Sequence, residues 1–144
     1  MDELKALGES RDRNKDLYQF QKPDSALLER FATPRTNLSD ENFGKLVVTV
    51  SVEEFTSLCP ITSQPDYAEL VIDYEPDQWC VESKSLKLFL IGYRNYGAFH
   101  ETVVWQVCDA LVQLLNPKTI QVRGNFRPRG GIAFVPTASW VRSI

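Results

Sequence analysis

The residue with the clearest chemical potential in this sequence is Cys59, a cysteine in a proline-rich segment. Pro60 follows it directly, and Asp66 follows seven positions later, after Pro65. A cysteine thiolate is a nucleophile, and a nearby carboxyl group could manage the protons of its reaction. The two prolines stiffen the segment that sets the distance between thiol and carboxyl group. The spacing therefore allows nucleophilic catalysis, although on spacing alone a lone cysteine is more often an inert, buried residue.

The single histidine, His100, lies between Phe99 and Glu101. This trio could bind a ligand, with the aromatic ring as a stacking face. The residues alone favour a simpler alternative, in which the histidine lies at the surface and the acid complements the dipole at the start of a helix. One histidine and three scattered cysteines give no recognisable metal-ligand spacing, so no metal site is expected.

Two short segments combine cations with residues typical of helix starts or turns. Ser83 or Ser85 could cap a helix, at whose start Lys84 and free amides could face an anion. Further along the chain, Arg129 and Gly130 fit either a hairpin turn or a loop that grips a phosphate. Neither segment is a nucleotide-binding fingerprint, so capping and turn formation remain sufficient explanations.

The hydrophobic pattern predicts the elements that must position these side chains. After residue 45, apolar residues first alternate with polar ones, then recur with a helical period, and alternate again near the C-terminus. The expected elements are strands at 46–51 and 68–74, helices at 86–93 and 103–114, and strands at 120–126 and 132–136, with a loop at 55–66. The order ββααββ favours an α+β fold, a four-stranded antiparallel sheet with two helices on one face.

Length and composition restrict the class of protein. The chain has 144 residues and a mass of 16.4 kDa, about one domain. A net charge of −3 argues against nucleic-acid and membrane-surface partners. The sequence has no long apolar run and no secretory signal pattern, and its odd number of cysteines fits free thiols. We therefore expect a cytoplasmic protein without a membrane or nucleic-acid partner.

Charge is concentrated near the N-terminus. Residues 1–45 carry 17 of the 35 Lys, Arg, Asp and Glu side chains and few apolar ones. Such a stretch buries too little to offset its ordering entropy. We therefore expect residues 1–40 to form a mobile or partner-packed arm and residues 41–144 a single catalytic domain. For the arm, a solvated extension without function is the favoured explanation.

Four segments, CPITSQPDYA, VESKSLKLFL, YRNYGAFHE and PRGGI, resemble in order and spacing the motifs of a known enzyme family. This family is the NADPH-dependent 7-cyano-7-deazaguanine reductases of the queuosine pathway. The similarity runs from about Asn42 to about Pro136. It implies the tunnelling fold, shared with GTP cyclohydrolase I, whose ββααββ protomers form oligomeric β-barrel rings, for example two stacked pentamers.

The resemblance also implies a reaction and its residues. Cys59 matches the nucleophile that attacks the nitrile carbon of 7-cyano-7-deazaguanine to give a thioimide, and Asp66 matches the proton donor. NADPH would then reduce the adduct to the aminomethyl product. The positions that match substrate-binding residues are Val81, Glu82, Ser83, Phe99, His100 and Glu101, and those that match NADPH-binding residues are Ser83, Lys84, Arg129 and Gly130.

Two alternatives stay open at this point. An amidine-forming transferase acting on a deazaguanine base in tRNA would use the same thioimide but would not need the ESKSLK segment, so this segment favours the reductase. A non-catalytic scaffold of the same fold would have no use for Cys59, Asp66, His100 and Glu101. One small domain also offers little room for a base and a dinucleotide, so we expect a homo-oligomer with sites between subunits and an inactive monomer.

Overall fold

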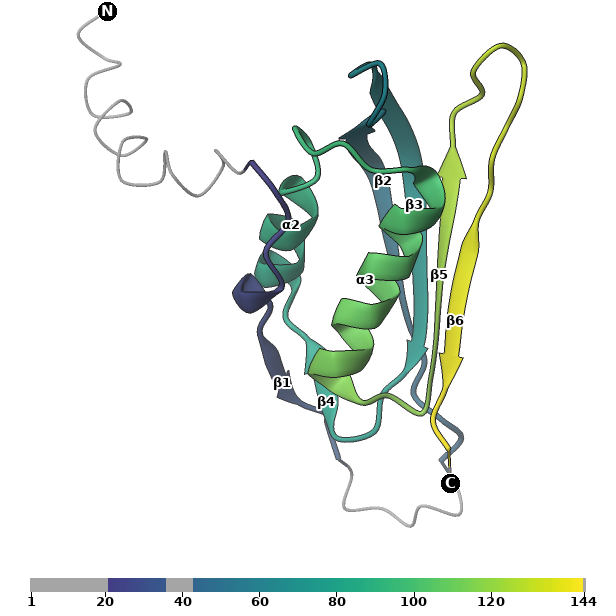
Figure 1. Ribbon diagram of the computed structural model, residues 1–144. Coiled ribbons are helices and arrows are strands. Elements are labelled where there is room, and N and C mark those ends of the chain that lie inside the picture. Colours follow the sequence, from purple (N-terminus) through teal and green to yellow (C-terminus); the bar gives the residue numbers. More distant parts are fainter. Residues whose placement is uncertain (1–20, 36–42, 144) are drawn as a thin grey trace, which may run out of the picture.

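The computed structural model describes residues 21–35 and 43–143 (Figure 1). Two helices lie against one face of a four-stranded sheet, and a separate two-stranded sheet lies beside them. The α+β class predicted from the sequence is confirmed. The elements, in chain order, are the 3-10 helix η2 (Ser25–Leu27), β1 (Arg30–Ala32), β2 (Val48–Leu58), β3 (Pro65–Glu75), β4 (Trp79–Val81), α2 (Ser83–Ile91), α3 (His100–Leu115), β5 (Thr119–Phe126) and β6 (Thr137–Val141).

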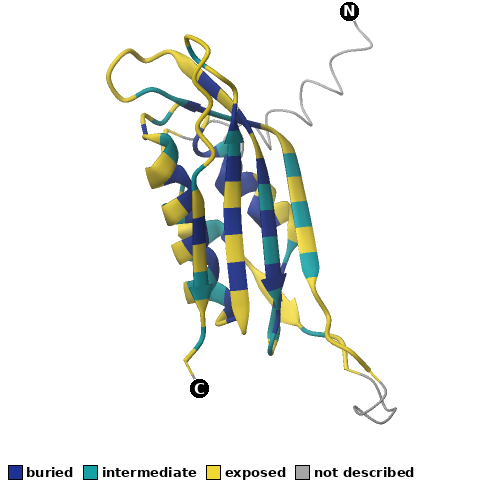
Figure 2. Cartoon of the chain, turned by 90° about the vertical axis from the view of Figure 1, so that its right-hand side faces the viewer, coloured by how far each residue is buried: buried dark blue, intermediate teal, exposed yellow. Residues whose placement is uncertain are grey.

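The large sheet is antiparallel throughout, in the order β2-β3-β5-β6. Along β3, buried and exposed residues alternate, as Figure 2 shows for the face that the helices leave open. Leu70, Ile72 and Tyr74 point into the core, while Tyr67 and Glu69 are exposed. This period of two is the pattern that the sequence predicted for a strand with one buried face.

Both helices bury the stripes that their sequence spacing predicted. In α2, Leu86 and Phe89 are buried, and in α3, Val103, Val107 and Leu111 are completely buried against the sheet. The helix α3 ends at Asn116, which adopts a left-handed conformation with φ 42° and donates its amide to Val112 O at 2.9 Å. The predicted stop at Asn116–Pro117 is therefore confirmed.

Three sequence-based expectations about local structure are wrong. The last strand is Thr137–Val141, not 132–136, because Pro136 has no N–H for a regular ladder. The loop predicted at 55–66 is shorter, since β2 continues to Leu58 and β3 begins at Pro65. The helix cap is Glu82, whose carboxylate accepts from the amides of residues 84 and 85, so neither predicted serine caps α2.

Part of the segment predicted as an arm packs on the domain. β1 pairs with β4, with Phe31 opposite Cys80, and the Glu29 amide donates to Ser85 Oγ at 2.9 Å. The remainder of that segment lies mostly in residues 1–20 and 36–42, outside the described part of the chain, so the boundary at residue 40 stays a prediction. In the described ranges, neither helix is long and apolar enough to span a bilayer.

Candidate active site

Cys59 begins the tight turn that joins β2 to β3. The Cys59 amide donates to Gln64 O at 2.8 Å, and the Ser63 amide donates to Cys59 O at 3.0 Å, with Ser63 in the left-handed region at φ 58°. These bonds fold the chain back on itself around the thiol. The half-buried thiol thus lies in a preformed loop at the end of the sheet.

The turn activates the thiol. Hydrogen bonds from the Thr62 hydroxyl, the Thr62 amide and the Ile61 amide lower the pKa of Cys59 from 9.0 to about 7, and the charge of Arg129 acts in the same direction. Burial has the opposite effect on Cys108, whose pKa it raises. Cys59 is therefore substantially ionised near neutral pH and suited to attack an electrophilic carbon.

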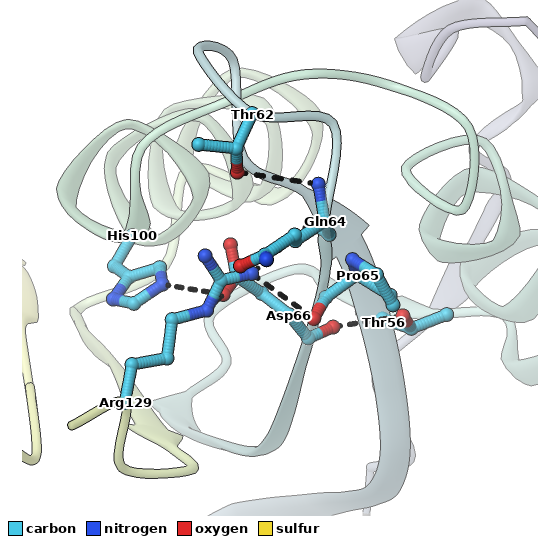
Figure 3. A network of polar contacts seen from close by, with 7 residues as sticks. All are labelled: Thr56, Thr62, Gln64, Pro65, Asp66, His100 and Arg129. Carbon is cyan, nitrogen blue, oxygen red and sulfur yellow. Dashed lines mark hydrogen bonds and ion pairs between the residues drawn. The ribbon is translucent and has the colours of Figure 1, made fainter. Parts of the chain in front are cut away.

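Asp66 lies directly behind this turn, at the start of β3, and is 5% exposed (Figure 3). Its Oδ1 atom is 2.7 Å from Arg129 Nε and 3.3 Å from His100 Nε2. Arg129 Nη2 also donates to the carbonyl oxygens of Gln64 and Pro65, both at 3.1 Å. Three segments far apart in the sequence therefore converge on one buried carboxyl group.

The loop between α2 and α3 brings His100 to the cysteine turn. This loop runs parallel to the end of β2, where the Leu58 amide donates to Tyr96 O at 3.1 Å and the Ala98 amide donates to Leu58 O at 3.0 Å. Two residues later, α3 begins with His100. Its ring stacks on Phe126 of β5, with centroids 3.9 Å apart and an interplanar angle of 8°. Stacking and the loop pairing together fix the imidazole beside Asp66.

These groups line one cavity of about 340 Å³. This volume is at the lower end of the range for small-molecule sites. The side chains in its wall offer a nucleophile, two carboxyl groups, an imidazole, a guanidinium and aromatic rings. The lining residues are Cys59, Pro60, Asp66, Ala98, Phe99, His100, Glu101, Arg129 and Phe134.

The other predicted substrate residues lie at the opposite end of the domain (Figure 1). The Val81 amide donates to the Tyr74 hydroxyl at 3.1 Å, near the end of β3 that is remote from Asp66. From Asp66 to Tyr74 the strand extends about 26 Å. Val81 and Ser83 line a different cavity, between β2 and α2. One chain therefore does not bring Glu82 and Ser83 to Cys59.

Within one chain, Glu82 caps the start of helix α2. Its carboxylate accepts from the Lys84 and Ser85 amides, both at 2.8 Å, and these bonds lower the pKa of Glu82. The two amides are consequently not free to hold an anion, contrary to one interpretation of the sequence. A phosphate here would be met by the Lys84 ammonium group and the Ser83 hydroxyl.

The Arg129–Gly130 turn fits a phosphate-bearing ligand in its chemistry. Gly130 and Gly131 have φ of 57° and 78°, and an added Cβ at either would have no atom within 4 Å. Their backbone is therefore open to close approach, next to the guanidinium of Arg129. Across the described ranges, no group of three His, Cys, Asp or Glu side chains is arranged to hold a metal ion.

Comparison with known proteins assigns the chain to a family. A family model described as QueF-like protein matches residues 65–143. The NADPH-dependent 7-cyano-7-deazaguanine reductase of Brucella anthropi is 51% identical over 78% of this chain and 68% of its own length. The enzymes of the same name from Helicobacter pylori strain Shi470 and Bdellovibrio bacteriovorus are 47% and 48% identical over 96% and 94% of this chain, and over 86% and 73% of their own lengths. The chain belongs to the QueF-like family.

A solved structure of related shape supports the fold assignment. The archaeosine synthase QueF-Like in its apo form superposes with a TM-score of 0.61, covering 65% of this chain and 91% of that one at 20% identity. At this identity the similarity concerns the fold alone. The QueF-like chain described here thus has the tunnelling-fold protomer that the sequence motifs predicted.

Sequence reasoning missed four residues of this QueF-like site. Thr62 stabilises the thiolate, Phe126 and Phe134 pack against the His100 ring, and Ser57 of β2 lies directly opposite Asp66 of β3. The sequence placed both phenylalanines in strands as core residues. Only the neighbourhood of Thr62 to Cys59 along the chain could have indicated its role.

Proposed function

We propose that this protein is an NADPH-dependent 7-cyano-7-deazaguanine reductase, which converts the nitrile to an aminomethyl group in queuosine biosynthesis. The observation that carries the proposal is the activated Cys59 thiol in one cavity with Asp66, His100 and Glu101. The high identity to reductases of this name, described above, supports the same activity.

The first step is addition of the Cys59 thiolate to the nitrile. The Cys59 sulfur forms a bond to the nitrile carbon, one π bond of the C≡N group breaks, and the nitrogen takes a proton from Asp66 to give a thioimide. Asp66 suits this task because it is buried at the same cavity. The loss of its proton leaves a carboxylate, which Arg129 and His100 stabilise.

The later steps reduce the carbon twice. NADPH, held by Arg129, Gly130, Ser83 and Lys84, would supply two hydrides, one for the thioimide carbon and one after the thiol has left. Between the two, the C–S bond breaks, Cys59 regains its electron pair as thiolate, and the substrate becomes an imine. Each hydride addition is matched by one proton on nitrogen, so the nitrile takes up four electrons and four protons in all. Asp66 delivers the first proton to the nitrogen, and its carboxylate takes up a proton from solvent before it delivers the second.

Binding of substrate and cofactor requires two copies of the chain. Phe99, His100 and Glu101 line the Cys59 cavity, whereas Val81, Glu82 and Ser83 lie at the far end of the domain. We therefore propose a homo-oligomer in which the far end of one subunit completes the cavity of its neighbour. Arg129 and Gly130 of one subunit, with Ser83 and Lys84 of the next, would hold the NADPH phosphates.

We further propose that the protein works in the cytoplasm on a free base, without nucleic acid. All three cysteines are unpaired, and the reaction needs Cys59 as a free thiol. The net charge of −3 gives no electrostatic attraction to tRNA.

One experiment tests this function. The protein is mixed with 7-cyano-7-deazaguanine and its intact mass is recorded, after which NADPH is added and its absorbance is followed. We expect an adduct of the nitrile on the parent protein, none on Cys59→Ala, and NADPH oxidation by the parent alone. An adduct that also forms on Cys59→Ala would contradict the proposal. Adduct formation without NADPH consumption would favour the transferase alternative instead.

A further inference from the structure

A buried serine next to the site has no hydrogen-bond partner. Ser57 is 0% exposed, and its hydroxyl has no partner among the described residues. A buried hydroxyl without a partner destabilises a protein, whereas an alanine of similar size would not have this cost. The fold of this chain therefore does not explain the hydroxyl, which is available for a group that changes during the reaction.

Ser57 faces Asp66. The two residues are direct partners in the antiparallel pair of β2 and β3, and both side chains point to the helix-covered face. Directly opposite residues have Cβ atoms about 5 Å apart, so rotation about χ1 brings a serine hydroxyl within hydrogen-bond distance of an opposite carboxyl group. The neighbouring Thr56 Oγ1 donates to the Asp66 carbonyl oxygen at 2.7 Å and so holds the backbone of this pair in register.

Of the two side chains that contact the Asp66 carboxyl group, Arg129 can bind only its charged form, and His100, at 3.3 Å, can accept from the neutral acid only when its Nε2 carries no proton. Arg129 is a donor without acceptor capacity, and it holds the carboxylate at 2.7 Å. A proton donor must also exist as the neutral acid, which needs an acceptor for its own O–H group. A serine hydroxyl both donates and accepts, so it can follow the carboxyl group through both protonation states. Arg129 is partly exposed and can leave the carboxyl group, whereas Ser57 stays buried beside it.

We propose that Ser57 is a positioning residue for Asp66, whose hydroxyl binds the carboxyl group when ligand occupies the Cys59 cavity. This inference rests on the proposed reductase function. It assigns to Ser57 the orientation of the acid during proton delivery to the substrate nitrogen, with no contact to substrate or cofactor.

The test compares Ser57→Ala with the parent protein in three measurements. The midpoint of thermal unfolding without ligand should be unchanged or higher, because no hydrogen bond is lost. Alkylation of Cys59 by iodoacetamide should proceed at the parental rate, since it needs only the thiolate. Formation of the 7-cyano-7-deazaguanine adduct and NADPH oxidation should both be about tenfold slower with unchanged KM, and the pH dependence of kcat should change, because both need the oriented acid.

Matched variants separate this role from packing. Ser85→Ala removes an equally buried hydroxyl that donates to Glu82 O at 2.8 Å and accepts from the Glu29 amide, so it should lower the unfolding midpoint. Ser57→Thr and Ser57→Val have nearly the same volume and differ only in the hydroxyl group. Adduct formation and NADPH oxidation should therefore be slower in Ser57→Val than in Ser57→Thr.

Several results would overturn the inference. Parental adduct and reduction rates in Ser57→Ala, or equal rates in Ser57→Thr and Ser57→Val, would show that the hydroxyl has no role. A fall in the unfolding midpoint of Ser57→Ala as large as that of Ser85→Ala would show that the hydroxyl is paired in the empty protein. A parent protein that forms no adduct would instead refute the reductase function, and this inference with it.

Discussion

At the scale of residues, the reactivity of the Cys59 thiol depends on the hydrogen bonds that it receives from the turn after it. The hydroxyl and amide of Thr62 and the amide of Ile61 donate to it and lower its pKa to about 7. In the middle of α3, Cys108 has the opposite environment, and burial raises its pKa. The same residue type is thus reactive at one position and inert at the other because of its hydrogen-bond donors.

Thr62→Val tests this account through the pH dependence of alkylation. Removing a donor to the thiolate raises the pKa of Cys59, so at pH 6 a smaller fraction is ionised and iodoacetamide should react about tenfold more slowly. Above pH 9 the parent and variant should react at similar rates, because both thiols are then ionised. Thr137→Val, an exposed threonine of β6, serves as the control. Identical profiles for parent and Thr62→Val would show that this hydroxyl does not activate the thiol.

At the scale of elements, the site depends on a short parallel contact between the end of β2 and the loop before α3. Gly97 lies at this junction, and a Cβ built on it would be 3.1 Å from Pro60 Cα. The contact ties the Cys59 turn to His100 through Leu58. Close packing of two backbone segments, together with the stacking of His100 on Phe126, therefore sets the relative position of Cys59 and the imidazole.

Gly97→Ala should move the Cys59 turn by a few tenths of an ångström and lower kcat/KM about tenfold or more, because small displacements of catalytic groups cost large factors in rate. Its thermal unfolding midpoint should change much less than its activity. Gly44→Ala is the matched control, since an added Cβ there meets no atom within 4 Å. Full activity in Gly97→Ala would show that the junction does not position the turn.

At the scale of the whole molecule, one protomer holds two separated halves of the expected site. The Cys59 cavity lies at one end of β3, and the start of α2 lies beside the other end. One small ligand cannot reach both, since about 26 Å of strand separates them. The arrangement becomes functional if neighbouring copies meet end to end around a closed ring.

Mixing two inactive variants tests this arrangement. Cys59→Ala lacks the proposed nucleophile and Glu82→Gln lacks the carboxylate proposed to bind substrate, so each should be inactive alone. After unfolding and co-refolding in equal amounts, about a quarter of the sites should combine an intact Cys59 with an intact Glu82 and regain NADPH oxidation. Refolding each variant separately and mixing afterwards is the control. No recovery after co-refolding would show that both residues act within one chain.

The sequence by itself predicted most of the fold and the nature of the site. The periods of two and 3.6 identified strands around Ile72 and helices around Leu86 and Val107, because these patterns reflect burial of one face of an element. It failed for the strand at 137–141, where short alternation at a sheet edge gives a weak signal. The pattern indicated a capped helix start at Glu82–Ser85 but could not decide which side chain is the cap, since glutamate and serine both suit this position.

Tertiary structure alone decided which of the expected site residues meet. Cys59, Asp66, His100 and Arg129 come from two strand ends, a helix start and a hairpin turn, and only the register of β3 and the Gly97 junction bring them together. The same register carries Glu82 away from them. The sequence could determine residue types and periodicity because these are local properties. Distances between segments follow from how the elements pack, which no local pattern encodes.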